Sequence, residues 1–190
     1  MVTLLMVCLT GSLSAQQSKP DNFKIIALPN AYGQVIDPTE NVEKGLVLIF
    51  SNHKCLYAQL YLDRIKSLYD RVSDRGIKLV LVETKIGSLE KTSASLDQYL
   101  KENGISFSYL IDIDNALAKS LGAESSPHAF LLRKEADRFE LVYDGSIDNN
   151  SRKPERVTRA YLENAVDQML ENKEIKYPKS KAVGCDISTN

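Results

Sequence analysis

Three short and nearly continuous apolar runs divide the chain and predict buried β-strands. They are "LVLIFS" at 46–51, "IKLVLVET" at 77–84 and "FSYLID" at 107–112. Apolar runs of this length, rich in β-branched and aliphatic residues, are typical of strands buried on both faces of a sheet. The alternating polar segments between them therefore have to supply the elements that cover that sheet.

The segments between and after these runs carry apolar residues at helical spacing. From Cys55 to about Arg75 the apolar positions recur every three or four residues, and Gly76 ends the pattern. An amphipathic helix is predicted over 89–103, a short helix over 115–122 and a last helix over 155–172. Glycine just after the last periodic residue is a common helix stop, which supports these ends.

Two regions read as antiparallel hairpins. Residues 23–45 contain closely spaced turn dipeptides, and 125–134 with 138–145 form an alternating pair around the turn "EAD". The resulting order of elements predicts an α/β protein with a central mixed sheet, helices on both faces and an N-terminal β-hairpin extension. That arrangement is the one of a thioredoxin-like fold.

Length and charge narrow the class of protein. The 190 residues predict one domain over 21–172 followed by a polar tail over 173–190, and a net charge of −1 gives no basic excess for nucleic acid. No phosphate-binding glycine loop or nucleotide fingerprint is present, so no cofactor is expected. Four aspartates at strand and loop ends lack metal-ligand spacing and read as turn carboxylates: Asp112, Asp114, Asp144 and Asp148.

The first residues, "MVTLLMVCLTGSLSAQQ", predict a signal peptide over 1–16, and hence a periplasmic or secreted protein. Ser12, Ser14 and Ala15 suit a signal-peptidase site, although no Lys or Arg precedes the apolar run. The run is too short to span a bilayer, so no membrane insertion is expected after cleavage. A lipoprotein anchored through Cys8 is the less favoured alternative, and an intracellular N-terminal strand is the third.

Cys55 opens the helix that follows the first buried strand. In open α/β sheets, chemistry collects where strands end and helices begin. Free N–H groups at a helix N-terminus stabilise an anion, and nearby cations such as His53 and Lys54 favour a thiolate further. The junction predicts a nucleophilic sulfur that attacks a disulfide or a peroxide. A small buried cysteine without reactivity is the alternative on position alone.

"SSPHAF" places Pro127 directly before an apolar strand. In thioredoxin-like folds a cis-proline at this position faces the active-site cysteine, and we expect the same of Pro127. An ordinary strand-initiating proline is the alternative. His128 follows at once and is a candidate proton donor, although a histidine beside a strand is more often simply packed.

Several stretches resemble one family. "FKIIALPNAYGQVI" resembles the opening of redoxin domains, and "CLYAQLYLDRI", "YDGSIDNN", "YLENAVDQML" and the terminal "GCDI" resemble the peroxiredoxin-like branch of the alkyl hydroperoxide reductase and thiol-specific antioxidant family. The resemblance covers about residues 23–188. It implies a thioredoxin fold and a redox ancestry for the chain.

The active-site motif departs from this branch, which typically carries "CNHCPY" with two cysteines. Cys55 matches the second cysteine, Asn52 occupies the position of the first, and Leu56 replaces the proline. Alignment on the letters "SNH" instead puts Ser51 at the first position, with Lys54 as an insertion. Ser125 and Ser126 stand where the branch often has a further cysteine. The peroxiredoxin signature is also absent, so local dithiol turnover is not expected.

Two hypotheses follow. The first is an exported redoxin-type protein with antioxidant or thiol–disulfide oxidoreductase activity, in which Cys55 is the nucleophile and Pro127 shapes the substrate groove. Its substrates would be a peroxide or a protein disulfide or thiol, resolved by an external thiol reductant. Cys185 is the other resolving thiol considered, but a separate role or a packing role is favoured for it. The second hypothesis is a non-catalytic, degenerate thioredoxin-like binding module that holds extended peptides beside Pro127.

Overall fold

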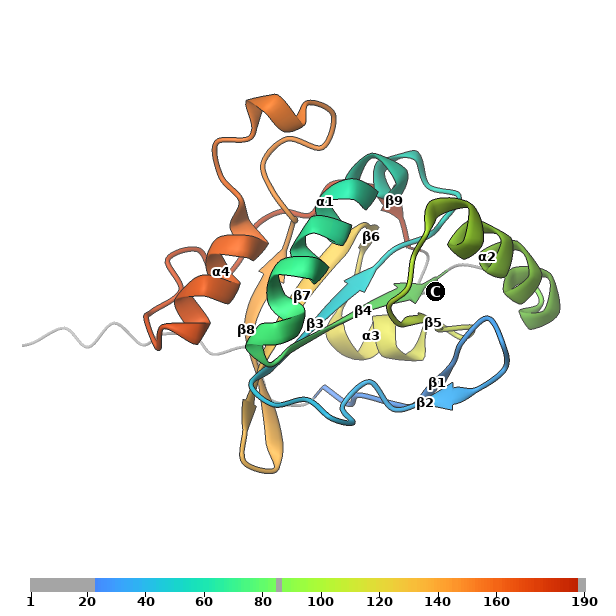
Figure 1. Ribbon diagram of the computed structural model, residues 1–190, viewed down its shortest axis with the longest axis horizontal. Coiled ribbons are helices and arrows are strands. Elements are labelled where there is room, and N and C mark those ends of the chain that lie inside the picture. Colours follow the sequence, from blue (N-terminus) through green and yellow to red (C-terminus); the bar gives the residue numbers. More distant parts are fainter. Residues whose placement is uncertain (1–22, 85–86, 188–190) are drawn as a thin grey trace, which may run out of the picture.

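A five-stranded mixed sheet forms the centre of the computed structural model, which describes residues 23–84 and 87–187 (Figure 1). Its strand order is β5-β4-β3-β7-β8. β3 and β4 are parallel, as are β4 and β5, whereas β7 runs antiparallel to both β3 and β8. The strands are β3 (Gly45–Phe50), β4 (Ile77–Glu83), β5 (Tyr109–Ile111), β7 (His128–Glu135) and β8 (Arg138–Gly145). The mixed sheet confirms the predicted fold class.

Helices cover both faces of this sheet (Figure 1). α1 (Leu56–Val72), α2 (Leu89–Asn103) and α4 (Tyr161–Leu170) share one apolar cluster with the sheet residues Val47 and Ile49. α3 (Ala116–Leu121) packs on the opposite face, in a cluster that includes Leu48 and Phe50. Alternate residues of β3 thus enter different cores, which is why its sequence is apolar throughout.

The N-terminal extension is a small hairpin, as the turn dipeptides predicted. β1 (Leu28–Pro29) pairs antiparallel with β2 (Val35–Ile36). The Asn30 side chain holds the turn, because its Oδ1 accepts the N–H groups of Tyr32 and Gln34 at 2.9 and 3.0 Å. Such asparagine side-chain bonds to the backbone are a standard way to stabilise a turn.

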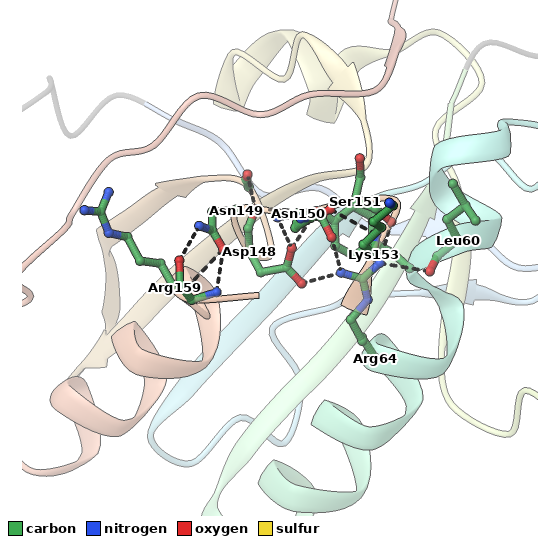
Figure 2. A network of polar contacts seen from close by, with 11 residues as sticks. Leu60, Arg64, Asp148, Asn149, Asn150, Ser151, Lys153 and Arg159 are labelled. Atoms are coloured by element: carbon green, nitrogen blue, oxygen red, sulfur yellow. Dashed lines mark hydrogen bonds and ion pairs between the residues drawn. The ribbon is translucent and has the colours of Figure 1, made fainter. Parts of the chain in front are cut away.

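The last helix begins later than the sequence predicted. Residues 155–160 are not its first turns: a short 3₁₀ turn spans Pro154–Arg156, and α4 starts only at Tyr161. The reason lies in the preceding loop, because Asn149 Oδ1 accepts the N–H groups of Thr158 and Arg159 (Figure 2). These bonds hold the chain extended where helical spacing alone suggested a helix.

The C-terminal tail is also more ordered than its polar composition predicted. A two-residue strand, β9 (Cys185–Asp186), pairs antiparallel with β6 (Ser125–Ser126) beside the first turn of α1 (Figure 1). The predicted signal peptide and Cys8 lie outside the described residues. In 23–84 and 87–187, no helix combines the length and apolar character needed to cross a membrane.

Candidate active site

Cys55 is the N-cap residue of α1. Its backbone is extended, with φ −80° and ψ 124°, and its N–H donates to the carbonyl of Asn52 at 2.9 Å. No acidic side chain lies in the first turn of α1, so the positive end of this helix dipole is not neutralised locally. The sequence placed Cys55 at this position correctly. Its side chain is buried, with 4% of the residue exposed.

Cys55 forms a disulfide with Cys185, across a sequence separation of 130 residues. The two Cα atoms lie 6.0 Å apart, within the range that a disulfide requires. The preference for a role of Cys185 apart from Cys55 was therefore wrong. Sequence reasoning considered Cys185 as a resolving thiol but ranked the pair lower, since the return of the polar tail across the domain depends on the strand pairing of β9.

The peptide bond between Ser126 and Pro127 is cis, as the sequence context predicted. It lies against the disulfide: the carbonyl oxygen of Ser126 is 3.2 Å from Cys55 Sγ. Because a disulfide sulfur carries no proton, this contact is not a hydrogen bond in the oxidised state. Cys55, Ser126 and Cys185 also line one cavity of about 260 Å³, together with Asn52 and Lys54.

Asn52 ties the loop before Cys55 to β6 and to Thr84, the residue after β4. Its N–H donates to Ser126 Oγ at 2.7 Å, and its side-chain amide donates to the carbonyl of Thr84 at 2.8 Å. The Lys54 N–H donates to Asn52 Oδ1 at 2.8 Å. The residue at the position of the missing cysteine thus positions the loop, while the exposed Lys54 side chain borders the cavity.

His53 is buried and paired, so its surroundings differ from those expected for a cation beside Cys55. Its Nδ1 lies 2.7 Å from Glu83 Oε2, and its N–H donates to the same oxygen at 3.0 Å. The ring packs against Tyr99, with the ring centres 5.5 Å apart. No described contact joins the His53 ring to Cys55. Stabilisation of a Cys55 thiolate by His53 therefore stays a prediction.

Glu83 is a buried carboxylate that sequence reasoning missed. It is fully buried at the end of β4, where Tyr109 also donates towards its Oε2 at 3.3 Å and to the carbonyl of Ser51 at 2.6 Å. Burial, and secondarily the Glu83 charge, raises the pKa of Tyr109 well above its usual value. A glutamate at the end of an apolar run carries no signal of burial, so only the fold reveals this cluster.

His128 is held by two partners rather than directed at the disulfide. Its Nδ1 accepts the N–H of Glu124 at 3.2 Å, while Nε2 lies 2.7 Å from Asp144 Oδ1. One acceptor and one donor nitrogen correspond to the neutral tautomer with a proton on Nε2. This arrangement agrees with the packed role that the sequence favoured over proton donation.

The aspartates considered for a metal site have separate partners. Asp112 accepts the N–H groups of Leu117 and Ala118 at the start of α3, and Asp144 pairs with His128. Asp148, in the loop after β8, pairs with Arg64 of α1. Burial raises the pKa of Asp112 despite the backbone N–H groups that lower it.

Arg64 anchors the loop that follows β8 (Figure 2). It contacts the Asp148 carboxylate, and its guanidinium also donates to the carbonyls of Asn150 and Ser151 at 2.9 and 2.7 Å. A guanidinium that satisfies several acceptors in one plane is a strong positional restraint. No sequence pattern pairs Arg64 with this loop, so the anchor was not predicted.

Comparisons with known proteins agree with this fold. A hypothetical protein of Sinorhizobium meliloti is 26% identical, with a TM-score of 0.73 over 87% of this chain and 91% of its own. A conserved protein from Geobacillus kaustophilus is 22% identical, with a TM-score of 0.73 over 85% and 86%. A secreted Mycobacterium tuberculosis disulfide oxidoreductase is 13% identical, with a TM-score of 0.51 over 78% and 96%. No functionally curated protein matches significantly.

A mixed sheet between two helical layers, with a cysteine at the N-terminus of α1 facing a cis-proline, defines a thioredoxin-fold protein. Within that class the assignment is sharper. The AhpC/TSA family profile matches residues 20–144, more than half of the 190 residues. The chain therefore belongs to the AhpC/TSA family, as the resemblance of its motifs implied.

Proposed function

We propose that this protein is an exported thiol–disulfide oxidoreductase whose redox centre is the Cys55–Cys185 pair. One observation carries the proposal: the disulfide joins the N-cap of α1 to a tail strand beside the cis-proline, at a cavity that both cysteines line. The pair replaces the local dithiol motif that Asn52 interrupts. It gives Cys55 the second thiol that two-electron exchange requires.

In the reduced protein, Cys55 acts as the attacking thiolate. The free N–H groups of the first turn of α1 favour its negative charge, and Lys54 lies close enough along the chain to add to this effect. The thiolate attacks a substrate disulfide, forms a Cys55–substrate bond and releases one substrate thiolate. Cys185 then attacks Cys55 Sγ and releases the second. The substrate gains two electrons and the Cys55–Cys185 bond is restored.

An external thiol reductant returns the pair to the dithiol state, with its own oxidation to a disulfide balancing the electrons. In the opposite direction, a substrate dithiol reduces the Cys55–Cys185 bond and leaves as a disulfide. A peroxide is a second oxidant to test. It would oxidise Cys55 to a sulfenate with loss of an alcohol or water, and Cys185 would condense with that sulfenate with loss of a second water.

Export fits this chemistry, because disulfides persist in oxidising compartments outside the cytosol. The predicted signal peptide over 1–16 supports a periplasmic or secreted location. The M. tuberculosis disulfide oxidoreductase that shares the fold is itself secreted, which also supports export of this chain. Localisation of the full-length chain in fractionated cells tests it, with residues 1–16 deleted as the control.

The activity is tested with reduced protein and a peptide disulfide that releases a chromophoric thiol. We expect turnover with a thiol reductant in wild type, none in Cys55→Ser and a stalled Cys55–substrate adduct in Cys185→Ser. A Ser95→Ala variant, changed at a half-buried position of α2 that does not line the cavity, serves as the matched control. Equal background rates for wild type and Cys55→Ser would instead favour the non-catalytic binding module, with the disulfide as a structural bridge.

A further inference from the structure

The C-terminal tail occupies the edge of β6 next to the cis-proline in the same way that a bound peptide strand would. Cys185 is the register partner of Ser126, and Asp186 is the partner of Ser125. The pairing continues with the Ile187 N–H, which donates to the carbonyl of Glu124 at 3.0 Å. Strand addition to an exposed edge is a general mode of peptide recognition, with backbone bonds for affinity and side-chain pockets for specificity.

The position before the cysteine admits only glycine. A Cβ at Gly184 would run into the carbonyl of Ser126 and lie 3.0 Å from Pro127 N. This close approach concerns space rather than backbone conformation. A segment that lies here therefore needs the smallest side chain immediately before its cysteine, because any larger one displaces the strand from the cis-proline.

The position two residues after the cysteine is an apolar pocket. Ile187 is 4% exposed and joins the cluster that α3 forms with the sheet, including Leu117 and Leu121. Asp186, between Cys185 and Ile187, is exposed. Alternation along a strand explains this pattern, since residues two apart point to the same side.

We propose that the β6 edge is a specific acceptor for extended peptides of the pattern glycine–cysteine–any residue–aliphatic, and that the tail is the resident occupant of that site in the oxidised protein. This inference rests on the proposed function and names its substrate class. Reduction of Cys55–Cys185 frees the last part of the tail, residues 184–187, which is otherwise held by a two-residue strand and one apolar side chain. The tail before it stays attached, because Ser180 remains bonded to Asp144 and Ser146. A partner protein's segment then takes the place of Gly184–Ile187, with its cysteine opposite Ser126.

The reaction at this site is a thiol–disulfide exchange between Cys55 and the bound peptide. The Cys55 thiolate attacks the sulfur of the peptide cysteine that is already part of a disulfide. The bond between Cys55 and the peptide forms as the bond to the leaving thiolate breaks. In a test peptide that leaving group is thionitrobenzoate, whose absorbance reports each event.

The experiment uses the reduced full chain with Cys8→Ser and Cys185→Ser, in which Cys55 is the one remaining thiol and no tail disulfide can form. Its probe is the peptide Lys-Ala-Val-Gly-Cys-Asp-Ile, activated at cysteine with thionitrobenzoate. We expect the peptide with Asp in place of Ile to react about tenfold more slowly, as loss of one well-fitted apolar contact implies. The peptide with Val in place of Gly should also react more slowly, because its side chain would run into the Ser126 carbonyl. Glutathione activated in the same way should also react more slowly than the parent peptide.

Competition with the tail supplies an independent readout. In Cys185→Ser the tail can still dock without the bond, so the added change Ile187→Asp should release it and speed the reaction of the parent peptide. The added change Lys181→Ala, outside the strand, is the matched control and should leave the rate unchanged. Equal rates in the presence and absence of Ile187→Asp would overturn the shared site.

The outcomes separate this inference from the proposed function. Equal rates for all activated peptides and for glutathione would overturn the sequence preference while leaving a reactive Cys55. Failure of Cys55 to react with any of them would contradict the proposed function itself. Reoxidation of wild type into dimers that join Cys55 of one copy to Cys185 of another would identify a second copy as the occupant, against the proposal.

Discussion

Ser126 and Cys185 face each other across an antiparallel pair, and Ser126 is the residue that precedes the cis-proline. The same cysteine is bonded to Cys55 at the N-terminus of α1. A tail strand, a cis-peptide and a helix N-terminus thus meet at one sulfur–sulfur bond. Both cysteines thus lie at one site, although sequence reasoning favoured Cys55 alone and kept Cys185 as the less favoured resolving thiol.

The disulfide should contribute strongly to stability, since it closes a loop spanning 130 residues of sequence. We expect reduction to lower the free energy of unfolding by about 2–4 kcal/mol. Urea unfolding with and without reductant measures the change. The double variant Cys55→Ser/Cys185→Ser is the control, and its unfolding midpoint should not respond to reductant. An unchanged wild-type midpoint would contradict a bridge that restrains the unfolded chain.

Glu83 should be required for the packing of the loop before Cys55. Glu83→Leu removes the acceptor of three donors from His53 and Tyr109, so we expect it to cost about 3–5 kcal/mol. Glu83→Gln keeps one acceptor oxygen and should cost less, about 1–3 kcal/mol. Denaturant unfolding gives both values. Glu102→Gln on the exposed side of α2 is the control, and equal effects at 83 and 102 would refute the role.

Arg64 should not be replaceable by lysine. Arg64→Lys keeps the charge near Asp148 but loses the planar fork that reaches the carbonyls of Asn150 and Ser151, for an expected cost of about 1–3 kcal/mol. Faster amide hydrogen exchange over 149–153 should accompany it. Arg71→Lys, whose partners Glu163 and Asp167 are partly exposed, should cost under about 1 kcal/mol. A reversed order would contradict the anchor shown in Figure 2.

Stability should fall at alkaline pH because of buried tyrosines. Burial is the first cause that raises the pKa of four of them: Tyr61, Tyr99, Tyr109 and Tyr143. Above about pH 10 the unfolded chain loses these phenolic protons while the folded chain retains them, so folding loses stability as pH rises. Below that pH the contribution is fully present. Unfolding midpoints measured from about pH 8 to pH 11 test the slope, which Tyr109→Phe should reduce.

The apolar pattern was sufficient to predict the sheet and most helices. Runs such as 46–51 are buried on both faces, and no irregular segment would be apolar throughout. The cis bond at Pro127 was also predictable, because its place before the β7 strand matches a known feature of the fold. These predictions succeed because each feature is determined by the residues of one short segment.

The remaining features depend on contacts between distant segments. The start of α4 was misplaced because Asn149 side-chain bonds hold 158–159 out of the helix, and helical spacing does not report such bonds. The partnership of Cys55 with Cys185 depends on a two-residue strand, too short to leave a periodic pattern. Gly184 was the available clue, since a glycine before a tail cysteine suits a close backbone approach.

The most direct test of the account is the redox behaviour of the native Cys55–Cys185 bond. The folded, mature protein is equilibrated with mixtures of reduced and oxidised glutathione, quenched with an alkylating agent and analysed by intact mass and peptide mapping. We predict a reversible conversion in which Cys55 and Cys185 are labelled together. A bond that persists in every mixture until the protein is unfolded would contradict a redox-active pair and leave a purely structural bridge.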